Sequence, residues 1–357
     1  GGDSMTLTRA DRAIVDDIVV SAMEAGVEPG VSIALAGPKG NYAMAYGISK
    51  RGLLRHQPMT LDKRCRIGSI TKSFVATALL QQLDKGTITL DATLDNFVTG
   101  VPNGDKITIK HMMMMQSGVY DYATWFPMQL MVTFRPTFRF VHTDTIINLI
   151  KSHPSSFEPG TSYGYTNSNY FLLGKVLERV VGKPVSQIVV EDVIKPIGLT
   201  ETQWLTTKSL PDPHAHGYSK RMFFPKHLKD QTKINPEILG AAGILTSTVG
   251  DLLKYAEYLK TESLLSPATH KLRAMTFTKQ PYPGEGPDHY EYGLGIVGFG
   301  TWIGHDGSVP GFSAVTMYDT VSGATFAGVE NLQTPGLAVF SRIFERIAGY
   351  LYPGSMT

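Results

Sequence analysis

The sequence predicts a mixed α/β (α+β) fold in which an antiparallel sheet is built from both ends of the chain. Strand-like patterns separated by short turns occur before about residue 65 and after about residue 288, and such hairpins join antiparallel strands. Helical patterns dominate the sequence between them. We therefore expect a single domain over residues 1–357, with a sheet lobe of about 1–65 and 288–357 and an inserted, mostly helical lobe of about 66–287.

The N-terminal part predicts a helix followed by a β-hairpin. Thr8 precedes apolar residues at helical spacing, which predicts a capped amphipathic helix that ends at Gly26. Residues 30–36 and 41–47 flank the turn sequence Gly37-Pro38-Lys39-Gly40, and this arrangement is typical of two hairpin strands.

The C-terminal part predicts the remaining strands and a second terminal helix. Residue patterns and turn residues indicate strands at 293–297, 302–305, 312–318 and 325–329. Apolar spacing from residue 337 to residue 351 then predicts a helix. We expect this helix and the N-terminal one to flank the sheet.

Composition excludes several classes of function. The chain has 357 residues, of which 42% are hydrophobic and 18% are charged, as in ordinary globular proteins. A formal net charge of +2 without any run of Lys or Arg predicts no nucleic-acid binding. No apolar stretch is long enough to predict a transmembrane helix.

The cysteine count and the first residues say little about the compartment. Cys65 is the single cysteine, so an internal disulfide is excluded, and we expect a small buried hydrophobe there. Gly1-Gly2-Asp3-Ser4 precede Met5 and are either an expression remnant before an initiator methionine or a processed end.

The pair Ser69 and Lys72 is the strongest chemical signal in the sequence. Apolar residues at helical spacing follow it, and Lys85-Gly86 predicts the end of that helix. Ser69 would then lie in the first turn, where backbone N–H groups lack partners and the helix dipole favours negative charge. Lys72, three residues later, would lie on the same face. A nucleophile, a candidate base and oxyanion donors in one turn predict covalent catalysis.

Two further segments turn this pair into a recognisable set. Tyr165 and Asn167 precede a predicted helix that ends at Gly182, and His305 and Gly307 follow a predicted strand. In this order, Ser69-x-x-Lys72, Tyr165-x-Asn167 and His305-x-Gly307 resemble the motifs of the serine penicillin-recognising enzymes. This family includes D-alanyl-D-alanine carboxypeptidases, class C β-lactamases, esterases and D-amino-acid amidases. Four further segments also resemble sequences typical of this family: residues 116–122, 196–202, 242–248 and 292–295.

The resemblance implies a β-lactamase/D,D-peptidase-like fold with the site in a cleft between the two lobes. It implies Ser69 as nucleophile, Lys72 as base and Tyr165 as the group that relays the proton. Asn167 would hydrogen-bond Lys72 and the substrate. His305 would supply a proton or a hydrogen bond, and Gly307 would let a substrate backbone approach the strand. The backbone N–H groups of Ser69 and Ser308 would form the oxyanion hole.

The implied function is acyl transfer to water through an acyl-enzyme, with no metal and no organic cofactor. We expect D-alanyl-D-alanine carboxypeptidase activity on cell-wall peptides, with esterase or class C-like β-lactamase activity as the alternative. A non-catalytic cell-wall-binding or phage-tail module is the alternative from another class. These functions imply a small-molecule or peptide substrate and a possible association with the cell wall. They fit an extracytoplasmic location better than a cytoplasmic one.

The sequence also departs from the family pattern. Carboxypeptidases of this family use an arginine soon after the Tyr-Gly-Leu-Gly segment to hold the terminal carboxylate of the substrate. Here those positions are Ile296, Val297 and Gly298, which leaves ester and amide substrates open. The glutamate base of class A β-lactamases has no recognisable counterpart either.

Four other features of the sequence have possible functional interpretations. Gly160-Thr161-Ser162-Tyr163-Gly164 matches a nucleophile elbow, but Pro159 argues against the strand that an elbow requires. His214 and His216 belong to no His-Glu-x-x-His pattern, so we expect surface loop residues, not metal ligands. The run 112–115 of four methionines predicts a buried helix. Aromatic residues within 125–140 and 222–224 would line an acyl pocket, cover the site, contact a partner or anchor loops.

Overall fold

A computed structural model of the chain describes residues 5–137, 141–221, 223–278, 290–333 and 339–356. Its centre is an eight-stranded antiparallel sheet with the strand order β3-β2-β1-β13-β12-β11-β10-β9. The strands are β1 Gly30–Ala36, β2 Tyr42–Lys50, β3 Gln57–Pro58, β9 Tyr290–Tyr292, β10 Val297–Phe299, β11 Trp302–Val309, β12 Phe312–Asp319 and β13 Thr325–Glu330.

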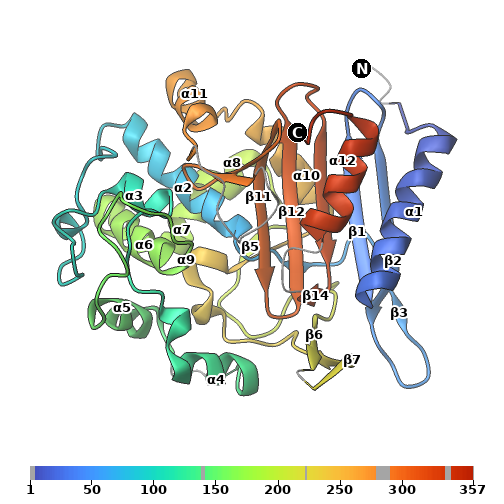
Figure 1. Cartoon of the computed structure of the whole chain (residues 1–357), viewed down its shortest axis with the longest axis horizontal. Coiled ribbons are helices and arrows are strands. Elements are labelled where there is room, and N and C mark those ends of the chain that lie inside the picture. Colours follow the sequence, from blue (N-terminus) through green and yellow to red (C-terminus); the bar gives the residue numbers. More distant parts are fainter. Residues whose placement is uncertain (1–4, 138–140, 222, 279–289, 334–338, 357) are drawn as a thin grey trace.

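The predicted assembly of this sheet from both ends of the chain is confirmed. The N-terminal strand β1 pairs with the C-terminal strand β13 in a register that runs from Val31 opposite Glu330 to Ala36 opposite Thr325. Two helices from the ends of the sequence pack together beside the sheet, α1 (Arg9–Gly26) and α12 (Glu345–Leu351) (Figure 1). Thr8 caps α1 as expected, since its hydroxyl accepts from the Asp11 backbone N–H over 3.1 Å.

The segment between these ends is mostly helical. Its helices are α2 Ile70–Asp84, α3 Ile109–Met113, α4 Phe126–Phe134, α5 Thr143–Lys151, α6 Ser168–Val181, α7 Val185–Val189, α8 Lys195–Ile197, α9 Gly240–Gly243, α10 Val249–Leu259 and α11 Pro267–Met275. Short 3-10 turns cover Leu94–Asn96, Tyr122–Thr124 and Pro236–Ile238, and π-type turns cover Val190–Ile194 and Val339–Phe344.

The described residues also form two small sheets. One joins β4 (Cys65–Arg66), β8 (Leu245–Ser247) and β5 (Gln203–Trp204), and the other joins β14 (Leu332–Gln333), β6 (Tyr218–Arg221) and β7 (Phe224–Asp230). In the first of these sheets β4 leads into α2, whereas the second lies below the strands of the main sheet in the view of Figure 1.

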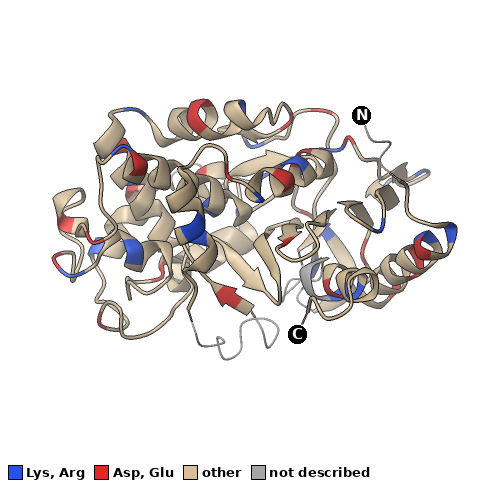
Figure 2. Ribbon diagram, turned by 90° about the horizontal axis from the view of Figure 1, so that it is seen from above, with Lys and Arg blue, Asp and Glu red and all other residues tan. Residues whose placement is uncertain are grey.

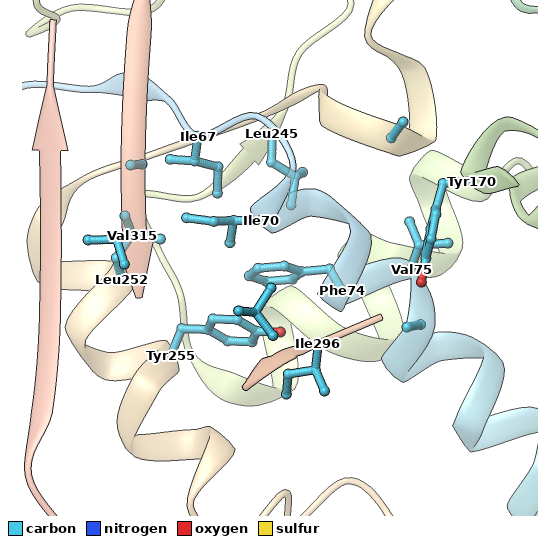
Figure 3. Close-up of a cluster of buried hydrophobic side chains, with 14 of the residues drawn as sticks. Ile67, Ile70, Phe74, Val75, Tyr170, Leu245, Leu252, Tyr255, Ile296 and Val315 are labelled. Atoms are coloured by element: carbon cyan, nitrogen blue, oxygen red, sulfur yellow. The ribbon is translucent and has the colours of Figure 1, made fainter. Parts of the chain in front are cut away.

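The core is continuous between the sheet and the helices. Helix α10 packs on β12 and β13, and α2 packs between β11 and α6. Phe74 of α2 stacks on Tyr255 of α10 with ring centroids 4.1 Å apart, beside Ile70 and Ile296 (Figure 3). Burial of this apolar surface is the main term that stabilises the arrangement.

Helix α2 differs from the sequence-based picture of a helix with one apolar face. Nearly all of its residues are buried, including Thr71, Lys72, Ser73 and Thr77. A helix buried all round is central to a large domain rather than amphipathic at its surface. The Ser69–Lys72 turn is therefore held by packing from every side.

One predicted strand is wrong. The sequence suggested a strand at 293–297, but β9 ends at Tyr292 and β10 begins at Val297. The intervening residues form the turn that joins these two antiparallel strands. Leu294 and Ile296 are buried in that turn, and buried apolar residues in a turn look like a strand in the sequence.

The expected burial of Cys65 and of the methionine run is confirmed. Cys65 and the four methionines of 112–115 are buried, although α3 itself ends at Met113. Acidic and basic residues are interspersed along the ribbon (Figure 2). Among the described residues, none of the helices combines the length and apolarity that a membrane crossing requires.

Candidate active site

Ser69 lies at the N-terminal end of α2, in the position that caps the helix. The preceding residue, Gly68, has a φ of +56°, and a Cβ there would lie 2.9 Å from Val309 Cγ1 and 3.1 Å from the Ser308 backbone nitrogen. Only glycine accommodates both the left-handed backbone and this close approach. The chain thus turns sharply against β11 and directs Ser69 into the first turn of α2, where the helix dipole is positive.

Lys72 connects this turn to two other segments. Its Nζ lies 2.8 Å from Ser69 Oγ, 2.7 Å from Asn167 Oδ1 and 2.9 Å from the carbonyl oxygen of Ala242. These three neutral acceptors match the three donors of an ammonium group. None of them is a carboxylate, so the charge is solvated by dipoles alone.

Burial sets the protonation of this amine. The Lys72 side chain is completely buried, and this desolvation lowers its pKa to about 7, with Asp306 and then Asp121 opposing the shift through their negative charge. A lysine with a pKa near neutrality can lose its proton at ordinary pH. In the neutral form, Nζ accepts a hydrogen bond from Ser69 instead of donating one.

Tyr165 and Asn167 reach the site from the loop before α6. Asn167 occupies the capping position of that helix, and its side-chain oxygen accepts from Lys72. The Tyr165 ring centroid lies 5.0 Å from Lys72 Nζ, and the ring packs edge-on against Tyr292 with centroids 5.8 Å apart. The aromatic ring and the amine are thus neighbours, which suits an exchange of protons between them.

Strand β11 forms the opposite wall of the site. A Cβ on Gly307 would lie 2.0 Å from the Ile67 carbonyl oxygen and 2.8 Å from the Ser69 backbone nitrogen. Glycine therefore permits β11 to lie against the segment that carries the serine. Within the described residues, the Ser69 backbone N–H donates to no other group. The Ser308 backbone nitrogen lies near the same turn, 3.1 Å from the position of a Cβ on Gly68. The role of these two N–H groups as oxyanion donors stays a prediction.

His305 lies behind the site and not in the cleft. It is fully buried, its Nε2 lies 3.0 Å from the Tyr292 hydroxyl, and its Nδ1 lies 2.6 Å from the Asp306 carbonyl oxygen. Burial, and then the charge of Lys72, lower the pKa of His305 to about 3. The imidazole is therefore neutral, which fits the expected hydrogen bond and argues against the alternative role as a proton donor.

Tyr292 and Asp306 are two site neighbours that the sequence motifs alone did not identify. Tyr292 contacts the rings of both Tyr165 and His305. Asp306 is buried beside them, and burial raises its pKa to about 6. The position of Asp306 inside the His305-x-Gly307 motif is a signal that could have pointed to it.

A cavity of about 380 Å³ opens in front of Ser69. Asn167 and Ser308 line it together with Ser69, and apolar side chains supply much of its wall: Met128 and Val132 of α4, Ile238, Leu239, Val309 and Pro310. No charged side chain is among the described residues that line it. Part of the aromatic-rich segment 125–140 thus lines the pocket beside the serine, whereas residues 138–140 lie outside the described residues.

The competing motifs lie elsewhere. Ser162 is exposed in a loop, and the described residues before it form no strand, so the nucleophile elbow is absent. His214 and His216 differ from expectation: their rings stack at 5.3 Å, and they lie 2.8 Å from Asp212 and Asp230, respectively. They are half-buried rather than surface residues, and the described residues contain no cluster suited to a metal ion.

Comparison with known proteins identifies the family of the chain. The family model described as Beta-lactamase matches residues 15–349, nearly the whole chain. The chain belongs to the beta-lactamase family. A crystal structure of a D-stereospecific amidohydrolase from Streptomyces sp. is 28% identical, with a TM-score of 0.79 over 92% of this chain and 97% of that one.

Other members of the beta-lactamase family have several activities in their names. A penicillin-binding protein of Bacillus subtilis is 22% identical over 80% of this chain and 64% of its own length. Esterase EstB of Burkholderia gladioli is 28% identical over 56% of this chain and 53% of its own length. The chain therefore spans less than two thirds of these curated relatives. The names of these relatives cover several activities, so membership of the family does not by itself give the activity or the substrate of this chain.

Proposed function

We propose that the chain hydrolyses D-alanyl-type peptides of cell-wall origin through an acyl-enzyme on Ser69. The observation that carries this proposal is the contact of 2.8 Å between Ser69 Oγ and the buried amine of Lys72. A hydroxyl is a weak nucleophile unless a neighbouring base removes its proton. A desolvated lysine with a pKa of about 7 is such a base at neutral pH.

The proposed reaction has two halves. In the first, neutral Lys72 accepts the Ser69 proton while Oγ bonds to the substrate carbonyl carbon. The carbonyl oxygen becomes negative and is stabilised by the backbone N–H groups of Ser69 and Ser308. As the intermediate collapses, the C–N bond breaks and the leaving amine takes a proton from Lys72 through Tyr165. The product of this half is an ester on Ser69.

In the second half, water replaces the amine. Tyr165, together with Lys72, accepts a proton from this water as its oxygen bonds to the ester carbon. The bond to Oγ then breaks, Ser69 regains its proton and the carboxylic acid is released. Asn167 holds Lys72 in place through both halves because its side-chain oxygen accepts from Nζ.

Amide or ester hydrolysis without a terminal carboxylate is a second candidate. A specific observation favours it: Ile296 and Val297 are buried apolar residues at the positions where carboxypeptidases have an arginine. No cation among the described residues lines the cavity beside Ser69. The amidohydrolase from Streptomyces sp. and Esterase EstB support the same candidate by similarity.

Adduct mapping tests the proposed chemistry before any substrate is known. We would incubate the protein with a fluorophosphonate or a fluorescent penicillin and locate the adduct by peptide mass mapping. We expect an adduct on Ser69 that is lost in Lys72→Ala and retained in the control Ser162→Ala. An adduct on Ser162, or none with either probe, would overturn the proposal.

A substrate panel then separates the candidates. It contains a D-Ala-D-Ala peptide, the corresponding D-alanine amide, p-nitrophenyl esters and nitrocefin. Preference for the peptide supports the carboxypeptidase, whereas equal or faster turnover of the amide and ester supports the second candidate.

An association with the cell wall, and with it an extracytoplasmic location, is part of the proposal. Binding of Ser69→Ala to isolated wall fragments tests it separately from turnover. Retained binding by a protein that forms no adduct and hydrolyses nothing would instead favour a non-catalytic wall-binding module.

A further inference from the structure

A second cavity of about 590 Å³ adjoins the one in front of Ser69. The two cavities share four lining residues: Val132, Thr133, Pro310 and Gln333. We call the second cavity the annex. Its outer wall is the hairpin of β6 and β7, which lies at the same end of the molecule as α4 (Figure 1). A molecule bound at Ser69 can therefore extend past Pro310 into the annex.

The charged side chains that line the annex are all positive. Lys220, Arg221 and Lys229 line it, and no acidic side chain is among its described lining residues. None of these three cations forms an ion pair with a carboxylate in the described part of the chain. Lys229 Nζ donates instead to the Thr133 carbonyl oxygen over 3.1 Å, which ties β7 to α4. The annex thus presents a positive field without its own counter-charge.

The annex also has an apolar component that ordinary surfaces lack. Phe134, Phe223 and Phe224 line it and are 68%, 82% and 62% exposed. Large aromatic side chains grouped at this exposure mark a binding surface more often than isolated apolar residues do. Beside the cations, they fit a ligand that combines an apolar chain with a negative end.

The position of the annex indicates which part of a substrate reaches it. Tyr165, the proposed donor to the leaving group, packs against Tyr292, and Tyr292 in turn hydrogen-bonds His305 of β11. Pro310, which lines the annex, follows the end of β11 at Val309 and comes five residues after His305. The leaving group belongs at the Tyr165 end of the site, so the acyl group must extend the other way.

We propose that the annex binds the far end of the acyl group, and that preferred substrates carry there a carboxylate on an apolar chain. The uncharged cavity beside Ser69 accepts the apolar part, and Lys220 and Arg221 attract the carboxylate. This inference rests on the proposed acyl-enzyme function and adds a substrate class to it. It would make the protein selective for anionic acyl groups independently of the leaving group.

The test uses p-nitrophenyl monoesters of adipic, suberic and sebacic acid, whose acyl chains end in a carboxylate. Each is compared with its own monomethyl ester, which has the same length and no charge. We expect acylation of Ser69, measured as the p-nitrophenol burst, to be faster for the anionic ester at one or more lengths. For the variant K220Q/R221Q, we expect this preference to fall by about tenfold, since two exposed cations that attract the carboxylate are removed.

Control variants separate an effect of the annex cations from a general effect of the charge of the protein. Lys85→Gln removes an exposed cation at the end of α2, remote from both cavities, and should leave the preference unchanged. The variant K220E/R221E should reverse the preference toward the neutral ester. High salt should weaken the preference of the parent protein, because these cations are exposed.

The outcomes distinguish this inference from the proposed function. If no ester acylates Ser69, the acyl-enzyme proposal fails and the inference fails with it. If both members of each pair acylate Ser69 at equal rates, and K220Q/R221Q behaves like the parent, only the annex inference is overturned. Equal losses for charged and neutral esters in K220Q/R221Q, indicating a damaged cleft, would also overturn it.

Discussion

Lys72 Nζ lies 2.8 Å from Ser69 Oγ, although the lysine side chain has no contact with solvent. An ammonium group buried without a carboxylate partner is costly, and the protein reduces this cost by lowering the pKa. The same burial that destabilises the charged form therefore favours a neutral amine beside Ser69, which suits the proposed role of Lys72 as base. Stability and proposed catalysis are linked at this one side chain.

Lys72→Arg should abolish acylation even though it keeps a cation at the site. A guanidinium group remains protonated at any ordinary pH and cannot accept the Ser69 proton. We expect the rate of acylation by p-nitrophenyl esters to fall on the order of a thousandfold. The matched variant Lys72→Met, which has no charge, should be equally inactive while its melting temperature is not lowered. An active Lys72→Arg protein would exclude Lys72 as the base.

The acylation rate should rise with pH through about 7, the pKa of Lys72. Below this pH the amine is protonated and cannot accept a proton from Ser69, so activity is lost as the pH falls. Asp306, when ionised, favours the charged form of Lys72. Asp306→Asn should therefore lower the pKa of Lys72 and move the acid limb of the profile to lower pH.

Asp121→Asn is the comparison for this experiment. Asp121 opposes the shift of Lys72 less than Asp306 does, so its removal should move the limb in the same direction by a smaller amount. The pH dependence of the fluorophosphonate reaction measures both shifts. A limb that does not move in Asp306→Asn, or moves upward, would show that another group controls the profile.

His305 should not titrate over the physiological range. Burial lowers its pKa to about 3, so its ring proton signals should stay constant between about pH 4 and 8. His305→Gln, which can still hydrogen-bond Tyr292, should leave the acid limb in place, and its kcat should fall less than that of His305→Ala. A signal from His305 that titrates near pH 6, identified by its loss in His305→Gln, would contradict this assignment.

Sequence reasoning recovered those parts of the fold whose patterns are local. The helix after Thr8 and the hairpin of β1 and β2 follow from spacing that repeats within a few residues. The turn between Tyr292 and Val297 was missed because its burial depends on a distant helix. A Cβ on Gly295 would lie 2.3 Å from Ala76 Cβ in α2, and no local pattern reveals that contact.

The candidate site was also predictable from the sequence only in part. The relation of Ser69 to Lys72 is a matter of helical spacing and was visible in the sequence. The pKa of Lys72 depends on burial by α6, α9 and β11, which only the fold supplies. The annex joins residues near 132 with residues near 220, and neither segment indicates the other in the sequence.

Arg273 and Glu262 should be a major source of stability. Arg273 is buried, and its Nη1 lies 2.7 Å from Glu262 Oε2. It also donates to the carbonyl oxygens of Leu294 and Ser73 over 3.1 Å each, which fixes the Tyr-Gly-Leu-Gly turn to α2. Arg273→Met leaves a buried carboxylate with one partner fewer, so we expect the free energy of unfolding to fall by about 3–5 kcal/mol.

The half-exposed pair of Lys183 and Glu191, 3.5 Å apart, is the control for this prediction. Lys183→Met should lower the free energy of unfolding by less than about 1 kcal/mol. Urea denaturation of both variants measures the difference. Equal effects of the two substitutions would mean that the buried pair contributes no more than a surface contact.

Gly307→Ala should inactivate the protein by moving β11 away from Ser69. The added Cβ would lie 2.0 Å from the Ile67 carbonyl oxygen and 2.8 Å from the Ser69 backbone nitrogen. Both are backbone atoms, so no side chain can rotate to make room. The oxyanion donors would separate, and we expect the acylation rate to fall by about a hundredfold or more.

Gly250→Ala is the matched control, because a Cβ at that position in α10 would meet no atom within 4 Å. This substitution replaces a helical glycine and should raise stability by about 0.5–1 kcal/mol while leaving acylation unchanged. Burst kinetics and thermal unfolding of the two variants separate a local effect on the site from a general effect of added methyl groups. A fully active Gly307→Ala protein would show that the close approach of β11 to Ser69 is not required, and would remove the support for an oxyanion site at Ser308.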